Sequence, residues 1–531
     1  MPATEHPLAH SAPAFPLGPW RALPPWGRSL LGLVACIAAA GLASIALRQD
    51  SSWDLMNYHY YNAWAFVHGR HGIDLAPAQL QSFHNPFLDL PFYALVAADV
   101  PPRAIAFLLA VPTGIAWYCF ARIVTTLFAS FEAAVRLPAI VAALAIAVTA
   151  PMSVSLIGTT MNDWYVAAFV LAALWLVVRT PAPSLRGLAL AGFLVGLGAG
   201  LKLTGSLYAV GLAAAVFLAP ASSSRARWYA AAVVVAGVVA GFTLTAGPWM
   251  ALMTQRFGNP LFPYYNDIFR SPWADPVSFS ATRFGPKSWL EWLGFPFVLL
   301  WKLEDFVSEP QFRDARPAVL YVLAIVALVR RRPGRITLDP RWRFLTIFFV
   351  GSLLAWAVMY RIFRYLVPLE LLAGAFIALL VARLVPPRRV AWALAAAFVL
   401  VVVTSKYPTW WRERFGEHFL SVQLPRVEPN ALVLLVTPEP MSYVLPSFPP
   451  DARFAGLVSS FNDPARHNRL QATIAATIRE HQGALYSLAV PPGQRVGDDA
   501  LAAMGLARTT CEEIVTNLRA SPLELCRLRR A

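Results

Sequence analysis

Two acidic side chains lie in polar stretches that border hydrophobic segments. Asp54 lies in the stretch SSWDLMNYHYY, and Asp163 lies in the stretch IGTTMNDWYVA. A carboxylate at the rim of a low-dielectric cavity tends to have a raised pKa, which suits a general base. The aromatic side chains around Asp54 indicate that it is partly buried. We therefore expect Asp54 to have a raised pKa and to act as a general base.

Each of these stretches also has a simpler explanation. The aromatic residues near Asp54 are typical of the belt that anchors a protein at the membrane interface. Asp163 lies at the expected membrane depth, where an unpaired charge is costly and therefore indicates function. It could instead be a first-turn acid favoured by the helix dipole, with Asn162 or Thr160 as the cap.

Basic side chains form the second chemical group. Arg361 and Arg364 lie beside Tyr365 in RIFRYLVP, on the side of the membrane where basic residues are uncommon. Guanidinium groups bind phosphate in a bidentate manner, so these arginines predict an anionic ligand such as a lipid phosphate. The alternative is pairing with Glu370 or with lipid headgroups. The remaining candidate binding residues are Lys202, Arg270, His59, His84 and Asn85.

A base, several cations and aromatic surfaces together favour the transfer of a sugar from a lipid phosphate to a hydroxyl group. In such a reaction the carboxylate accepts the proton of the hydroxyl, and the cations stabilise the departing phosphate. Aromatic rings provide surfaces on which sugars stack. The sequence therefore predicts one outward-facing site formed by Asp54, Asp163 and Arg364.

The composition requires that these residues be positioned by membrane helices. Of the 531 residues, 57% are hydrophobic and only 14% are charged, and the mean hydropathy is +0.53. Soluble domains carry about 25% charged residues. The net charge of +15 comes mainly from basic residues between hydrophobic segments, as the positive-inside rule predicts. It therefore does not indicate a nucleic-acid partner.

Eleven hydrophobic segments are predicted to form membrane helices. They are residues 29–48, 103–128, 134–151, 161–179, 187–201, 205–220, 229–252, 316–331, 342–360, 364–384 and 389–406. A cytoplasmic N-terminus places basic clusters such as RRRPGR (330–335) on the cytoplasmic side. A further span at 288–306 would reverse that orientation, so we expect this segment to lie in the outer interface. Two short helices are expected to meet at the KLTG sequence, whose first residue, Lys202, is expected at the outer surface.

The expected fold is therefore a mostly α polytopic transmembrane bundle with a small C-terminal α/β domain. Strand-like and amphipathic helical stretches after residue 406 indicate that domain, in which Cys511 and Cys526 are either disulfide-bonded or free. The expected parts are a Pro-rich cytoplasmic N-terminus (1–28), a transmembrane domain (29–406) with outer loops at 49–102 and 253–315, and an extracytoplasmic domain (407–531).

Several stretches resemble the GT-C superfamily of integral-membrane glycosyltransferases, and within it the family-39-like bacterial enzymes. SSWDLMNYHYY matches the first outer loop, in which that superfamily carries an acidic base or essential residue. Three further stretches are similar to stretches of the family: NPFLDLPFYAL, GLGAGLKLTGSLY and RIFRYLVPLE. The second places Lys202, and the third places Arg364 and Tyr365, at positions that match the family's patterns. The resemblance spans about residues 29–406.

The resemblance implies an inverting hexosyl- or pentosyltransferase that uses a polyprenyl-phosphate sugar in a bacterial inner membrane. A membrane lipid, a glycan or a protein would be the acceptor. Asp54 has no adjacent second acid, which argues against a metal site, although a divalent metal stays open. The second proline of the RYxxPxxP pattern is also absent.

Two other functions fit parts of the sequence. A transporter or flippase for a lipid-linked saccharide would also need outer cations, aromatic surfaces and many helices. Transporters commonly have repeated halves with broken helices at matching positions, and the sequence has no such repeat. A membrane scaffold would explain the C-terminal domain but not the grouping of Asp54, Asp163 and Arg364.

Overall fold

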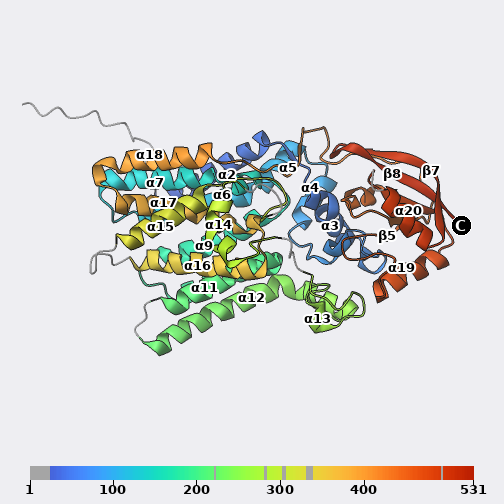
Figure 1. The fold of residues 1–531 in the computed structure, drawn as a ribbon, viewed down its shortest axis with the longest axis horizontal. Coiled ribbons are helices and arrows are strands. Elements are labelled where there is room, and N and C mark those ends of the chain that lie inside the picture. Colours follow the sequence, from blue (N-terminus) through green and yellow to red (C-terminus); the bar gives the residue numbers. More distant parts are fainter. Residues whose placement is uncertain (1–23, 220–222, 280–283, 302–305, 331–338, 492–493) are drawn as a thin grey trace, which may run out of the picture.

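The computed structural model describes residues 24–219, 223–279, 284–301, 306–330, 339–491 and 494–531. Within these residues a helical bundle lies at one end of an elongated molecule and a sheet domain lies at the other (Figure 1). Most of the expected cytoplasmic N-terminus (1–28) and of the RRRPGR segment is outside the described residues.

Each of the eleven expected membrane segments forms a helix. The helices are α2 (Pro25–Ala46), α5 (Pro102–Leu109) with α6 (Val111–Leu127), α7 (Ala133–Val148), α9 (Asp163–Val178), α10 (Leu185–Leu201), α11 (Ser206–Leu218), α12 (Ser224–Phe257), α15 (Arg316–Val329), α16 (Pro340–Met359), α17 (Val367–Leu384) and α18 (Pro387–Val403). In the described part, five helical segments are long and apolar enough to cross a membrane, and they comprise residues 25–46, 102–127, 224–257, 340–359 and 363–384. The predicted membrane bundle is confirmed.

Small residues allow α10 and α12 to approach closely. A Cβ atom added to Gly192 of α10 would lie 2.3 Å from the carbonyl oxygen of Val234, and one added to Gly237 of α12 would lie 2.3 Å from that of Ala189. Such small-residue contacts are typical of membrane helices, whose association depends on van der Waals packing. This packing fixes the end of α10, where Lys202 lies. The helix breaks there and resumes as α11, as expected at KLTG.

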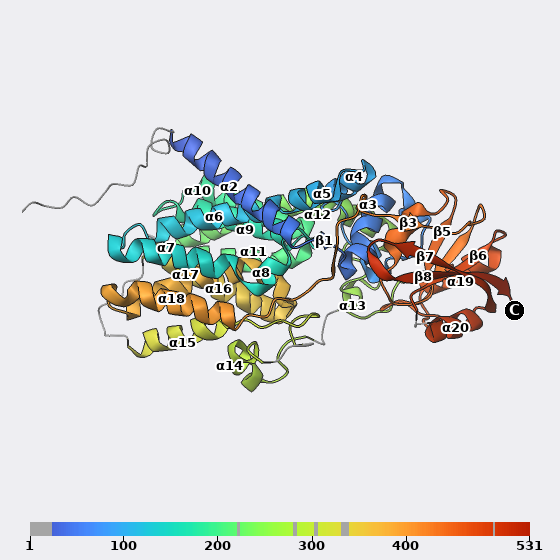
Figure 2. The same ribbon diagram turned by 90° about the horizontal axis from the view of Figure 1, so that it is seen from above.

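The segment 288–306 contains only the short helix α14 (Trp289–Val298). Ten residues span about 15 Å, half the thickness of a hydrocarbon core. Trp289 and Leu290 are strongly exposed, and α14 lies beside the bundle close to α15 (Figure 2). The helix is therefore too short to be a span, as predicted, although residues 302–305 lie outside the described part.

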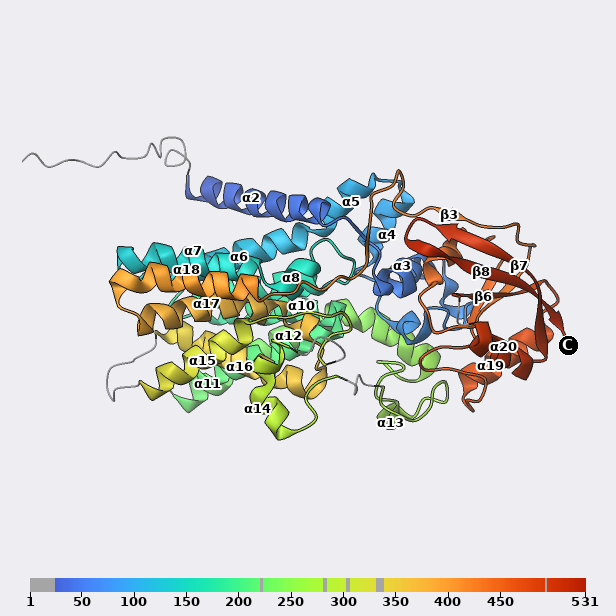
Figure 3. The ribbon, with the colours of Figure 1, turned by 45° about the horizontal axis from the view of Figure 1, so that its top comes forward.

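The first outer loop forms a folded wedge between the bundle and the C-terminal domain (Figure 3). It contains α3 (Tyr60–Val67) and α4 (Leu90–Ala97), and its first residues form strand β1 (Gln49–Asp50). Strand β1 pairs antiparallel with β2 (Arg412–Glu413), just after the last helix of the bundle. Leucine and tyrosine side chains of the wedge share a buried apolar cluster with strands of the C-terminal domain.

The C-terminal domain has the expected α/β fold. Its six-stranded sheet has the order β3-β7-β8-β6-β4-β5, and β4 is parallel to both β5 and β6. The remaining elements are β3 (Val422–Gln423), β4 (Leu432–Leu435), β5 (Arg453–Gly456), α19 (Arg469–Glu480), β6 (Leu485–Ala489), α20 (Gln494–Ala503), β7 (Leu506–Thr516) and β8 (Arg519–Arg530). Helix α19 connects the parallel strands β5 and β6, and its amphipathic sequence packs its apolar face against the sheet core.

A disulfide joins Cys511 of β7 to Cys526 of β8. Of the two alternatives for these cysteines, a disulfide or two free thiols, the structure therefore favours the disulfide. Replacing both by Ala is expected to lower the free energy of unfolding of this domain by about 2–4 kcal/mol, because the crosslink restricts the unfolded chain. Thermal unfolding in detergent measures this loss. Reductant should lower the midpoint of the wild type but not that of the double variant; equal midpoints without reductant would contradict the prediction.

Candidate active site

Asp54 lies at the boundary between the bundle and the first outer loop. It directly precedes a π-helical turn, Leu55–His59, in which residues four and five positions apart lie on one face. The Tyr58 hydroxyl accordingly donates to Oδ2 of Asp54 over 3.4 Å. Asp54 is 8% exposed, so the partial burial expected from its aromatic neighbours is confirmed.

Arg364 is the principal partner of Asp54. Its Nη1 donates to Asp54 Oδ2 over 2.7 Å, across 310 residues of sequence. The alternative pairing with Glu370 is wrong, because Glu370 instead accepts from the backbone N–H groups of Met152 and Ser153.

The expected raised pKa of Asp54 is also wrong. Burial is the largest influence and would raise the pKa, but the Arg364 guanidinium, with weaker contributions from His59 and Lys202, outweighs it. The pKa of Asp54 therefore lies below its ordinary value, and this side chain is a carboxylate at neutral pH. It can accept a proton but is a weak base while Arg364 holds it.

A second ion pair joins Lys202 to Asp163. Lys202 follows the last residue of α10 and Asp163 is the first residue of α9, and their side chains are 2.7 Å apart. Asp163 is thus both a first-turn acid and a paired charge. The expected cap is not formed, because the Asn162 amide donates to Asp89 instead.

The two ion pairs share neighbours and form one charged cluster, defined here as Asp54, Arg364, Lys202 and Asp163. Arg364 contacts the Met161 sulfur, and Lys202 donates to the Met161 carbonyl oxygen. Both cations also lie over the Tyr365 ring, Lys202 Nζ at 5.5 Å and Arg364 Cζ at 5.4 Å from its centroid. The predicted convergence of Asp54, Asp163 and Arg364 is therefore present in the geometry.

Two histidines of the first loop, His59 and His84, lie near Asp54 of this cluster. His59 Nδ1 lies 2.7 Å from Oδ1 of Asp89. His84 is hydrogen-bonded to the Tyr264 hydroxyl over 2.9 Å, and its ring meets the Tyr58 ring edge-on. Burial lowers the pKa of His84 to about 4, so its imidazole is neutral at physiological pH.

Three predicted binding residues do not join the cluster. The Asn85 amide donates to the carbonyl oxygens of Gly200 and Thr245, so it fastens α10 to α12. Arg361 donates to the carbonyl oxygen of Ala357, near the end of the preceding helix α16. Arg270 is exposed at the end of α13 (Asn266–Phe269). Among the described residues, none of these three forms a hydrogen bond or ion pair with the four charged residues of the cluster.

Two residues of the site were not predicted from the sequence. Met161 joins the two ion pairs, and Trp410 lies under Arg364 with its centroid 5.5 Å from Cζ. The Trp410 indole also donates to the Ser155 hydroxyl. The only sequence signal was position: Met161 lies two residues before Asp163, and Trp410 follows the last helix of the bundle.

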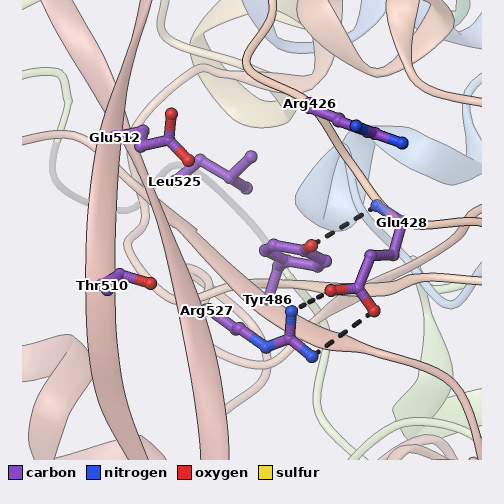
Figure 4. A pocket seen from close by; sticks show the side chains of 7 residues that line it. All are labelled: Arg426, Glu428, Tyr486, Thr510, Glu512, Leu525 and Arg527. Atoms are coloured by element: carbon purple, nitrogen blue, oxygen red, sulfur yellow. Dashed lines mark hydrogen bonds and ion pairs between the residues drawn. The ribbon is translucent and has the colours of Figure 1, made fainter.

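The C-terminal domain carries a separate pocket of about 370 Å³. It lies on the sheet and is lined by polar side chains, including an ion pair between Glu428 and Arg527 (Figure 4). It shares no residue with the charged cluster. Among the described residues, the one group of three side chains with metal-ligand spacing is Cys511, Glu524 and Cys526, and its cysteines form the disulfide.

The charged cluster can bind an anion and accept a proton. Two cations beside one aromatic ring provide donors for phosphate oxygens. Asp54 is paired with one of these cations, Arg364. When a bound anion pairs with Arg364 instead, the Asp54 carboxylate becomes a stronger base. The same arrangement thus links anion binding to proton abstraction.

Comparison with known proteins gives one family match. The model of Glycosyltransferase family 87 matches residues 83–359, which is just over half of the chain. No match was found among curated protein sequences.

Comparison with solved structures gives a shared fold. The structure of ArnT from Cupriavidus metallidurans bound to undecaprenyl phosphate aligns with a TM-score of 0.53 at 12% identity, covering 94% of this chain and 97% of that chain. Its apo state gives the same values. The apo oligosaccharyltransferase of Archaeoglobus fulgidus aligns with a TM-score of 0.44 at 13% identity, over 89% of this chain and 71% of that chain.

Proposed function

The chain belongs to glycosyltransferase family 87, and from this we propose that it transfers a sugar from a polyprenyl-phosphate donor to a hydroxyl group. The acceptor is a lipid, a glycan or a protein on the outer face of a bacterial inner membrane. The single observation that carries the proposal is the meeting of a buried and a part-buried acid–cation pair beside Tyr365.

Membership of family 87 refines the sequence-based expectation. The chain is a membrane glycosyltransferase of the GT-C type, as the resemblance predicted, and the family model that matches is that of family 87. The solved relative from Cupriavidus metallidurans was crystallised with undecaprenyl phosphate. That complex supports a polyprenyl phosphate as the lipid partner here.

In the proposed reaction the donor phosphate binds Arg364 and Lys202. Arg364 then interacts less with Asp54, whose carboxylate accepts the proton of the acceptor hydroxyl. The hydroxyl oxygen forms a bond to the anomeric carbon of the sugar, while the bond from that carbon to the phosphate oxygen breaks. The electron pair leaves with the phosphate, and the two cations stabilise its added negative charge. Attack from the opposite face inverts the anomeric centre.

Two labelled donors test the proposal on the purified protein in lipid vesicles. A polyprenyl-phosphate sugar and the corresponding nucleotide sugar are each incubated with a panel of membrane lipid and glycan acceptors. We expect a new glycoside from the polyprenyl-phosphate sugar alone. Transfer from the nucleotide sugar would contradict the donor assignment. Movement of intact donor across the vesicle, without any new glycoside, would identify a flippase instead.

A further inference from the structure

His59 has a geometry that its assignment as a binding residue does not explain. It is 3% exposed and ends the π-helical turn that begins after Asp54. His59 is five positions after Asp54, which is the spacing that a π-helical turn brings onto one face. His59 is therefore held on the face of the turn that carries Asp54.

Asp89 determines which nitrogen of His59 carries the hydrogen. Oδ1 of Asp89 accepts from the Asn162 amide over 2.7 Å and lies 2.7 Å from His59 Nδ1. An ionised carboxylate only accepts hydrogen bonds, so Nδ1 is the donor. In the neutral ring the lone pair is then on Nε2.

Nε2 of His59 is buried and has no hydrogen-bond partner among the described residues. Leaving a buried polar atom unsatisfied costs about 1–3 kcal/mol, and such atoms are uncommon unless they serve a purpose. Metal binding is one such purpose, but no group of three metal-ligand side chains in the described part includes His59. A neutral imidazole held in this way presents the lone pair of Nε2 as an acceptor for a proton.

We propose that His59 accepts the acceptor's proton from Asp54 and that Asp89 positions it to do so. This inference rests on the proposed function. The hydroxyl proton moves first to the Asp54 carboxylate and then to Nε2 of His59, whose lone pair forms the new N–H bond. Asp54 is thereby restored as a carboxylate, and the positive charge on the imidazolium is balanced by Asp89. The proton leaves to solvent after the product departs.

The charges around His59 are consistent with this order of transfers. Tyr58 faces it from its own turn and Asp54 from the residue before that turn. Asp89 faces it from the start of α4 and His84 from the preceding loop, while Lys202 and Arg364 act through Asp54. Because the pKa of Asp54 is lowered, a protonated Asp54 releases its proton readily. The pKa of His84 is lowered to about 4, so His84 does not compete for that proton above pH 5.

The test measures transfer by His59→Gln as a function of pH. We expect kcat to fall by about 10²–10⁴-fold with little change in donor KM, and the acidic limb of the wild-type pH–rate profile to disappear. Imidazole added to His59→Ala should restore part of the rate.

Asp89→Asn should lower kcat, because without the carboxylate the His59 ring can adopt the tautomer with its hydrogen on Nε2. Unchanged thermal unfolding of each variant excludes misfolding.

His68→Ala is the matched control, because His68 is an exposed histidine nine residues further along the same loop. It should keep the wild-type rate and show no response to imidazole. Full activity of His59→Gln, or a loss that raises only KM and is not rescued, would overturn the inference. If the wild type transfers sugar, Asp54→Asn does not, and His59→Gln is fully active, the proposed function stands without the relay. If the wild type transfers nothing, the proposed function itself fails.

Discussion

Replacing Asp54 by Asn is expected to lower kcat by about 10²–10⁴-fold, the usual contribution of a general base. Asparagine has nearly the same shape as aspartate but does not accept the hydroxyl proton. The donor KM should change little or fall, because Arg364 no longer has a carboxylate competing with the donor phosphate for its guanidinium. Steady-state transfer with a labelled polyprenyl-phosphate sugar separates the two constants.

Asp99→Asn provides the control for this change. Asp99 lies in the same outer loop and pairs with His418, but both side chains are more than half exposed. Exposed ion pairs contribute little to stability, so this variant should keep the wild-type rate. If Asp54→Asn also keeps it, Asp54 is not the base. If instead Asp54→Asn raises KM and leaves kcat unchanged, Asp54 acts in binding alone.

The alternation of the helices made much of the site predictable. Asp163 and Lys202 lie 39 residues apart, yet each is at an end of a hydrophobic segment, and counting the spans placed both ends on one side. The same count placed Asp54 and Arg364 there. Membrane thickness imposes this regularity on the sequence, because successive hydrophobic segments must cross the same hydrocarbon core.

The contacts within the site were less predictable. Which cation faces which acid depends on the rotation and tilt of each helix, which packing sets. The sequence therefore left Glu370 open as an alternative partner of Arg364 and grouped Arg361 and Arg270 with the binding residues. The pKa of Asp54 was predicted in the wrong direction for the same reason, since burial alone was visible and the guanidinium was not.

The outer loops were the least predictable part of the fold. The sequence separated the loop at 49–102 from the domain after residue 406, whereas Gln49–Asp50 pairs with Arg412–Glu413 and Leu75 pairs with Ala455. Strand pairs of one or two residues leave no periodic pattern in a sequence. As a result, Trp410 was assigned to the outer domain although it contacts Arg364.

Replacing Arg364 by Gln is expected to have an effect on activity comparable with the loss of the base, but with a different dependence on pH. Removing one preorganised donor from a developing negative charge typically costs about 10²–10³-fold in kcat. In addition, burial would then raise the pKa of Asp54 without the guanidinium to oppose it. A base must be deprotonated to act, so the residual activity should rise with pH over a range where wild-type Asp54 is already ionised.

Stability separates this role from a purely structural one. Breaking a buried ion pair by removing one partner destabilises a protein by about 3–5 kcal/mol, because it leaves an uncompensated charge. The double variant Asp54→Asn with Arg364→Gln removes both charges and should recover much of the thermal stability lost in Arg364→Gln. Its transfer activity should stay as low as that of the worse single variant, because both the base and the arginine that binds the phosphate are missing.

Arg389→Gln is the matched control for the arginine, since Arg389 is exposed at the start of α18 and far along the helix from the site. It should match the wild type in both rate and pH profile. Recovery of activity together with stability in the double variant would mean that the Asp54–Arg364 pair only holds the loop against the bundle. Stability without activity would place the pair in the reaction, because the fold would then be intact while the proton acceptor and the phosphate-binding cation are gone.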